Sequence, residues 1–210
     1  DDFKPLWAQS ACSRGIFMGN NDYFFDTGKG DFDKSDNYSP CNRIAEKFAP
    51  QCYFYPEHMF KTMNITIKNN LSAAFAQCEN ISPVKFVKYC DQAIGRILAS
   101  TAYTNPAQAI AACYDGSQPT YADSCLLGIL RSVLKQNEKA DFGLKFCSLT
   151  KLDFKAACYG IVGIWIKTFF NPAKQELESE CAKAPDTNYV ANCINAKPGT
   201  GAGVSVFEPV

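Results

Sequence analysis

The cysteines of this chain recur with a regularity that constrains its fold more than any other feature. Ten of the eleven cysteines form five pairs separated by 11 or 12 residues, and successive pairs begin 37, 35, 34 and 34 residues apart. An aromatic residue stands four positions before the second cysteine of every pair. Self-similarity at such a period is typical of a repeat architecture. The pairs are Cys41 with Cys52, Cys78 with Cys90, Cys113 with Cys125, Cys147 with Cys158 and Cys181 with Cys193, and the aromatic residues are Phe48, Phe86, Tyr121, Phe154 and Tyr189.

Local signals inside the repeats predict paired helices. Asn105 is a favourable N-cap and Pro106 suits the first helical position, so a helix is expected to begin there and to end near Gly116. After a short turn, the segments 121–134 and 151–170 carry apolar residues at helical spacing. Each repeat is therefore interpreted as helix A, a tight turn and helix B, with one cysteine late in A and the other early in B.

The hairpin arrangement favours a disulfide within each repeat. Antiparallel helices joined by a short turn bring these two cysteines together, although the sequence alone leaves other connectivities open. Closing a loop of about a dozen residues stabilises a fold by roughly 3 kcal/mol in the chain-entropy estimate. The aromatic residue shares the helical face of the second cysteine, and we expect it to pack over the disulfide and against the neighbouring hairpin.

The period of 34 residues and the helical hairpins resemble the tetratricopeptide-like repeats, and more closely their secreted, cysteine-stapled relatives. The resemblance covers residues 41–198 and rests on period, hairpin signals and cysteine placement, since the Trp, Leu-Gly and Tyr positions of the tetratricopeptide consensus are not recognisable. It implies an all-α fold, a right-handed solenoid of about five disulfide-stapled helix-turn-helix repeats. By analogy it also implies protein or peptide binding.

Three parts are expected along the chain: an irregular N-terminal segment over 1–40 with a degenerate opening helix, the five repeats over 41–198, and an extended tail over 199–210. Pro50 and Pro56 flank Cys52, so the first repeat is expected to have an irregular second half. Helix B of the last repeat is expected to be short because a Pro-Gly pair interrupts it. The tail is β-prone and is suited to adding a strand to a neighbouring subunit through Val204, Val206 and Phe207.

The cysteine content predicts an oxidising location: extracellular, periplasmic or lumenal. The chain begins at Asp1 without an initiator methionine, as expected of a processed chain or of a piece of a longer precursor. Glycosylation sequons, which are typical of secreted proteins, provide candidate sites for N-glycans, with ordinary surface asparagines as the alternative. They begin at Asn37, Asn64, Asn70 and Asn80.

Charge and hydropathy argue against two classes of partner. Lys+Arg and Asp+Glu both total 21, and a zero net charge disfavours nucleic-acid binding and anionic membrane surfaces. The longest apolar run, residues 159–170, is interrupted by Lys167 and is shorter than the about 20 residues that a bilayer requires, so membrane insertion is not expected.

Few residues point to chemistry, and no catalytic residue is assigned. His58 is the single histidine and lies beside no nucleophile motif, so we interpret it as a surface or helix-start residue. No two cysteines are closer than 11 residues, which excludes zinc knuckles. A calcium site in the N-terminal loop is one interpretation of its hard oxygen ligands, and a solvated acidic turn is the other. The candidate ligands are Asp26, Asp31, Asp33 and Asp36.

Cys12 is the cysteine left over from the pairs. Its neighbours resemble the segments around Cys125 and Cys158, which suggests helix B of a degenerate opening unit. We expect either a buried free thiol or an intermolecular disulfide at this position.

The leading functional hypothesis is a secreted non-enzymatic helical-repeat module that binds another protein or assembles with itself. One alternative is a structural subunit of an extracellular filament, sheath or surface layer. Another is an extracellular hydrolase that uses carboxylates of the N-terminal region as acid and base.

Overall fold

The structure is a computed structural model. It describes residues 6–27, 33, 35–56, 59–60, 70–137 and 140–197. Within these ranges every regular element is helical, so the predicted all-α class is confirmed there. The described residues divide into two compact units, one within 6–97 and 112–128, the other within 98–111 and 129–197.

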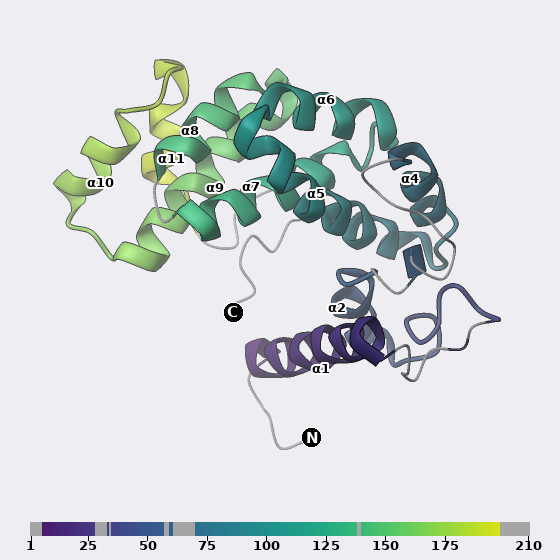
Figure 1. The fold of residues 1–210 in the computed structure, drawn as a ribbon. Coiled ribbons are helices and arrows are strands. Elements are labelled where there is room, and N and C mark those ends of the chain that lie inside the picture. Colours follow the sequence, from purple (N-terminus) through teal and green to yellow (C-terminus); the bar gives the residue numbers. More distant parts are fainter. Residues whose placement is uncertain are drawn as a thin grey trace. The chain divides into compact units, whose positions relative to one another are not determined.

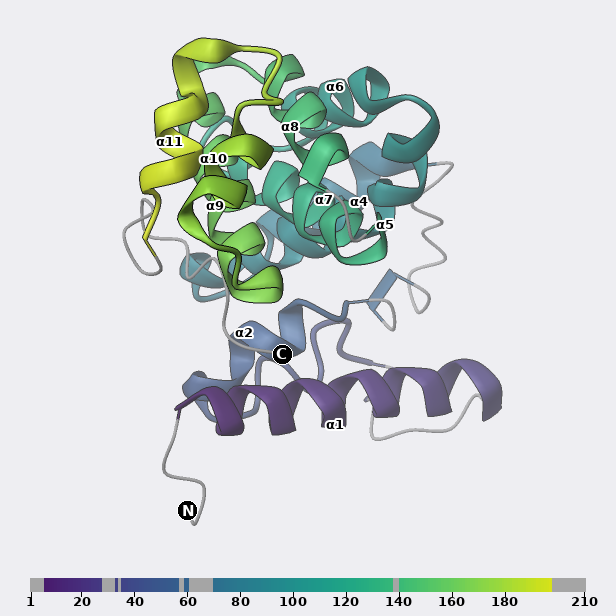
Figure 2. The same ribbon diagram turned by 90° about the vertical axis from the view of Figure 1, so that its left-hand side faces the viewer.

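From α4 to α7 and from α8 to α11, successive helices are joined by short connections (Figures 1 and 2). The division between the units passes through α5, α6 and α7, so each of these helices contributes residues to both. The α-helices are α1 (Leu6–Thr27), α2 (Ala49–Tyr53), α4 (Leu71–Glu79), α5 (Val87–Thr104), α6 (Pro106–Gly116), α7 (Ala122–Asn137), α8 (Ala140–Leu149), α9 (Leu152–Phe170), α10 (Lys174–Cys181) and α11 (Val190–Asn195). Short 3-10 helices are η1 (Glu46–Phe48), η2 (Val84–Phe86) and η3 (Thr187–Tyr189).

All five cysteine pairs are joined within their own repeat, as the hairpin arrangement predicts. The Cα atoms of the bonded cysteines lie between 5.4 and 5.8 Å apart, which is the ordinary spacing for a disulfide. Every bonded cysteine is buried, with at most 4% of its surface exposed. We number the hairpins 1 to 5 by these disulfides in chain order. The bonds are Cys41 to Cys52, Cys78 to Cys90, Cys113 to Cys125, Cys147 to Cys158 and Cys181 to Cys193.

The same turn precedes the second cysteine in all five hairpins. The backbone N–H of the recurring aromatic residue donates to the carbonyl oxygen three residues earlier, over 2.8 to 3.2 Å. This bond is the mark of a 3-10 turn, which tightens the start of a helix. Because it recurs, the aromatic side chain and the second cysteine enter helix B in the same relation each time. The pairs are Phe48 with Ala45, Phe86 with Pro83, Tyr121 with Gln118, Phe154 with Lys151 and Tyr189 with Asp186.

Aromatic stacking joins successive hairpins at two of these positions. The ring of Tyr53 in hairpin 1 stacks on Phe86 of hairpin 2, with centroids 5.7 Å apart. The ring of Tyr159 in hairpin 4 stacks on Tyr189 of hairpin 5, with centroids 5.4 Å apart. Both tyrosines directly follow the second cysteine of their hairpin. The expected packing of the recurring aromatic against a neighbouring hairpin is confirmed at both junctions.

Glycines bring the backbones of adjacent B helices into contact. A Cβ atom on Gly95 of α5 would lie 1.9 Å from the carbonyl oxygen of Cys125, and one on Gly163 of α9 would lie 1.9 Å from that of Cys193. Both glycines stand five residues after the second cysteine of their own hairpin. Gly128 of α7 makes the reciprocal approach, 1.9 Å from the carbonyl oxygen of Gln92. No residue with a side chain fits at these crossings without moving a backbone.

Hairpin 1 departs from the predicted helix–turn–helix form in its first half. Residues 37–44 form turns where helix A was expected. In the second half, which was expected to be irregular, α2 has only 5 residues. The carboxylate of Asp33 accepts the backbone N–H of Ser35 at 2.9 Å, and that of Asp36 accepts the N–H of Tyr38 at 3.0 Å. These aspartate turns satisfy the backbone locally and so compete with a helix.

Replacement of Gly95 by alanine is expected to destabilise the protein because the new methyl group meets a backbone carbonyl that cannot rotate away. Overpacking of this kind costs about 1–3 kcal/mol or more. The matched control is Gly19→Ala in α1, where a Cβ meets nothing within 4 Å. That change removes a helix-interior glycine and should leave stability equal or raise it by up to about 1 kcal/mol. Urea unfolding with the disulfides intact measures both variants; equal effects would contradict the packing described.

Candidate functional site

Helix α1 packs against α2 along one side and exposes the neighbouring side to solvent. The two helices are in contact and lie side by side in both views (Figures 1 and 2). Ser13 is buried, and Phe17 and Asn20 are half-buried. These three positions are spaced by four and three residues, so they share one helical face.

The uncovered side carries apolar residues and glycines. Cys12, Ile16, Gly19 and Tyr23 follow one another at steps of four, three and four residues, and all four are exposed. Ile16 is 62% exposed and Tyr23 is 51% exposed. Gly15 lies next to this row, and a Cβ atom built on Gly15 or Gly19 meets nothing within 4 Å. We call these five residues the outer face of α1.

The thiol of Cys12 is free and exposed, so the expectation of a buried thiol is wrong. The reason is the rotation of α1 about its axis. At this turn of the helix Ser13 is the buried residue, with 6% of its surface exposed. Cys12 therefore stands on the outer face with Ile16 one helical turn away.

The exposure of this face is unusual for its composition. Single exposed hydrophobic side chains are common on protein surfaces. Here Ile16 and Tyr23 share a row with the exposed thiol of Cys12. Apolar side chains that share one row, instead of being scattered singly, are typical of an interaction surface. The outer face is therefore the candidate functional site of the described chain.

Cys90, the second cysteine of hairpin 2, has a neighbour that differs from those of the other second cysteines. Its predicted bond to Cys78 is confirmed, with the Cα atoms 5.6 Å apart and both cysteines fully buried. The residue that follows Cys90 is the buried Asp91, whereas an apolar or aromatic residue follows each of the other four. Alignment of the five repeats on their second cysteines is the signal that finds this difference.

The acidic residues of the N-terminal loop gather around an arginine. The Arg43 guanidinium lies 3.0 Å from the carboxylate of Asp33 and 3.0 Å from that of Asp36. The pKa of Asp33 is lowered chiefly by hydrogen bonds from Ser35, and the pKa of Asp36 is lowered chiefly by a hydrogen bond from Asn42. Both carboxyls are thus ionised near neutral pH and face a cation.

This arrangement bears on two of the sequence-based hypotheses. A general acid needs a raised pKa, whereas those of Asp33 and Asp36 are lowered. For calcium, Asp31 and the side chain of Asp26 lie outside the described residues. Among the residues that are described, no group of three or more His, Cys, Asp or Glu side chains is placed to hold a metal ion. The calcium site stays a prediction.

Three of the four sequon asparagines are described, and all three are exposed. Asn37 lies in the turns before Cys41. The side-chain oxygen of Asn70 accepts the backbone N–H of Ala73 at 3.3 Å and caps α4, while the amide nitrogen of Asn80 donates to the Ala76 carbonyl at 3.0 Å. Asn64 lies outside the described residues, as does His58. Asn37, Asn70 and Asn80 are exposed and therefore accessible to modification. Glycosylation at these positions stays a prediction.

The β-prone tail residues Val204, Val206 and Phe207 also lie outside the described residues, so their assembly role stays a prediction. The last described segment is held by Lys167 of α9, whose ammonium donates to the carbonyl oxygens of Ile194 at 2.7 Å and Ala196 at 2.6 Å.

No family model, curated protein or solved structure significantly matches this chain. Fold and bonding therefore define its class: a disulfide-stapled, all-helical protein. Five disulfides indicate an oxidising compartment. A search of the described helices finds none with the length and apolar character that a membrane span requires.

Cys12 is expected to be the one cysteine that a maleimide labels in the folded, unreduced protein, because it is exposed and the other ten are bonded and buried. Intact mass spectrometry should show one added label, which the Cys12→Ser variant lacks. Denaturation and reduction before labelling should raise the number to eleven. More than one label on the native protein would contradict the five disulfides.

Proposed function

We propose that this protein is a secreted, non-enzymatic helical-hairpin module that self-associates through the outer face of α1. The observation that carries this proposal is the uncovered apolar row with a free thiol on a helix whose inner face is already packed. The finer description as a right-handed solenoid belongs to the same proposal. It is supported by the turn that recurs in all five hairpins and by the contacts between adjacent B helices.

The outer face suits the close approach of another helix. Gly15 and Gly19 have no Cβ atoms, so a partner backbone can come nearer to α1 there than at any larger residue. Ile16 and Tyr23 border Gly19 along the row and supply the apolar area whose burial drives association. An aromatic side chain such as Tyr23 is among the largest contributors to an interface.

Cys12 favours a second copy of the same chain as the occupant. An odd cysteine in a secreted protein points to intermolecular pairing. A two-fold symmetric contact brings the same patch of both copies together, so residues near the axis meet their own counterparts. Two Cys12 thiols then join when glutathione disulfide accepts their two electrons and two protons and leaves as two glutathione thiols.

The other hypotheses differ from this one in what they require. A filament, sheath or surface layer needs a second contact in addition to α1, and the predicted strand addition by the tail is the candidate for it. A hydrolase needs a carboxyl that is protonated near neutral pH. The ionised Asp33 and Asp36 beside Arg43 do not favour that role.

The Gly19→Leu variant tests the proposed contact. A leucine at this position has open space around it, so it leaves the single chain folded and improves the propensity of α1 for helix. The same side chain blocks the approach of a second helix. We expect wild-type protein to change from monomer to dimer with rising concentration in analytical ultracentrifugation. Gly19→Leu should weaken the dimer at least tenfold, while Gly19→Ala, which adds a single methyl group, should weaken it less.

Cys12→Ser separates non-covalent association from the disulfide. This variant should still dimerise but lose the reducible dimer that glutathione disulfide produces in wild-type protein on non-reducing electrophoresis. A wild-type chain that stays monomeric at every concentration would overturn the proposal. Equal dimer affinities in the Gly19→Leu and Gly19→Ala variants would also overturn it.

A further inference from the structure

The position after the second cysteine is a buried slot in hairpins 1 to 4, and in hairpins 1 and 4 its residue stacks on an aromatic ring of the next hairpin. Tyr53, Leu126 and Tyr159 occupy it in hairpins 1, 3 and 4, and each is at most 1% exposed. In hairpin 2 the residue after Cys90 is Asp91, which is also 1% exposed. An acidic side chain therefore stands where the equivalent positions hold large apolar ones.

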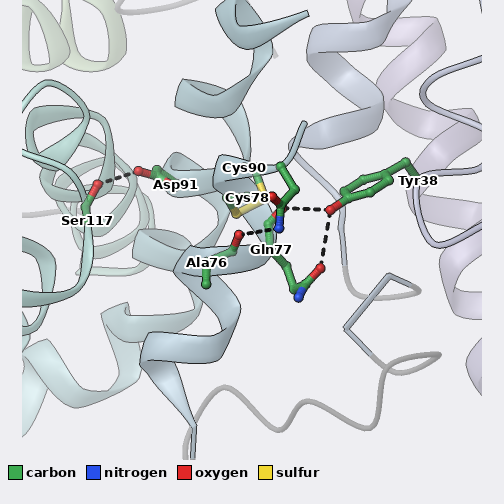
Figure 3. Close-up of a disulfide and its surroundings, with 8 residues drawn as sticks. Tyr38, Ala76, Gln77, Cys78, Cys90, Asp91 and Ser117 are labelled. Atoms are coloured by element: carbon green, nitrogen blue, oxygen red, sulfur yellow. Dashed lines mark hydrogen bonds between the residues drawn. A yellow bond between two sulfur atoms is a disulfide. The ribbon is translucent and has the colours of Figure 1, made fainter. Parts of the chain in front are cut away.

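Within the described part of the chain, the Asp91 carboxyl has one hydrogen-bond partner. The hydroxyl of Ser117, just after α6, donates to Oδ2, as Figure 3 shows beside the disulfide of Cys90. The other oxygen, Oδ1, has no hydrogen-bond partner among the described residues. The neighbouring Gln92 amide nitrogen is buried and likewise without a hydrogen-bond partner in the described part of the chain. Burying an ionised carboxylate with so little compensation is costly, whereas a neutral carboxylic acid fits such a site better.

The charged groups around Asp91 do not offset a negative charge. Glu79 of α4 acts on Asp91 with a charge of the same sign. The guanidinium of Arg96, on the same helix as Asp91, is instead placed over the rings of Phe54 and Tyr55, 5.7 and 5.1 Å from their centroids. Among the described groups that act on the Asp91 carboxyl, none is a cation.

We propose that Asp91 makes the packing of hairpin 2 against hairpin 3 pH-sensitive, because its neutral carboxyl fits the slot and its ionised carboxylate loosens it. The pKa of Asp91 is raised from 3.8 to about 7, chiefly by burial; the Ser117 hydrogen bond lowers it and the charge of Glu79 raises it, and about 7 is the net value. The packing of hairpin 2 against hairpin 3 therefore changes between mildly acidic and neutral pH.

The sign of the effect follows from proton linkage. The folded state keeps the proton of Asp91 while the unfolded state releases it above pH 3.8. The contribution of Asp91 to stability is thus full below pH 3.8 and is lost as the pH rises to about 7. Other carboxyls with lowered pKa values, such as Asp33 and Asp36, change stability in the opposite sense over more acidic pH. A matched variant is required to isolate Asp91.

The test compares wild-type protein with Asp91→Asn and Asp115→Asn. Asparagine has nearly the shape of the protonated acid but does not ionise, so thermal unfolding midpoints of Asp91→Asn should lack the fall from pH 4 to 8 that wild type shows. Asp115 is exposed near the end of α6, and Asp115→Asn should retain the wild-type profile. Hydrogen exchange, corrected for its intrinsic pH dependence, should locate the loosening of wild type at the amides around Asp91 and Gly128.

Carboxyl carbon NMR tests the same proposal in the wild-type chain, independently of how Asp91→Asn folds. The Asp91 signal should titrate with a midpoint near 7, and Ser117→Ala should move that midpoint upward because a hydrogen bond that favours the charged form is lost. A midpoint near 4 in wild type would overturn the proposal. So would wild-type and Asp91→Asn unfolding profiles with the same pH dependence. The outcome does not depend on whether α1 dimerises.

Discussion

The disulfide that joins the end of helix A to the first turns of helix B is the constraint on which the rest of the structure depends. It places the second cysteine of each hairpin at a fixed, buried point. In hairpins 2 and 4, a glycine five residues on, Gly95 or Gly163, meets the carbonyl of the next second cysteine. In these two hairpins the staple thus sets both the geometry of its own hairpin and the contact with its successor.

Sequence signals that act locally predicted the structure well. Asn105 caps α6 by accepting the backbone N–H of Gln108 at 3.1 Å, and the helices over 106–116 and 152–170 begin and end within a residue or two of their expected bounds. The disulfide pairing followed from the hairpin itself. The glycine crossings were not predicted, because periodicity marks the buried face of a helix but does not say which backbone will lie against it.

The candidate site was predictable in one residue but not as a surface. Cys12 stood out because it has no partner in the cysteine pattern, yet its exposure depends on the rotation of α1 against α2. That rotation cannot be inferred from segment 6–27, where apolar residues occur on more than one side. Gly15 and Gly19 add a second observation about this face. Each weakens an isolated helix by up to about 1 kcal/mol relative to alanine, and no contact within the described chain requires the absence of a side chain there.

Comparison of Asp91 with the equivalent positions of the other hairpins separates what the fold requires from what is particular to hairpin 2. Cys90 forms the same disulfide as its counterparts, and Tyr53, Leu126 and Tyr159 fill the slots equivalent to Asp91, so hairpin stacking does not require an acid there. A buried carboxyl with one unpartnered oxygen in the described structure lowers stability near neutral pH instead of raising it. Departures from local design rules concentrate at functional or strained positions. A proton-dependent role explains why an acid stands in this slot, because only an ionisable group makes the junction respond to its surroundings.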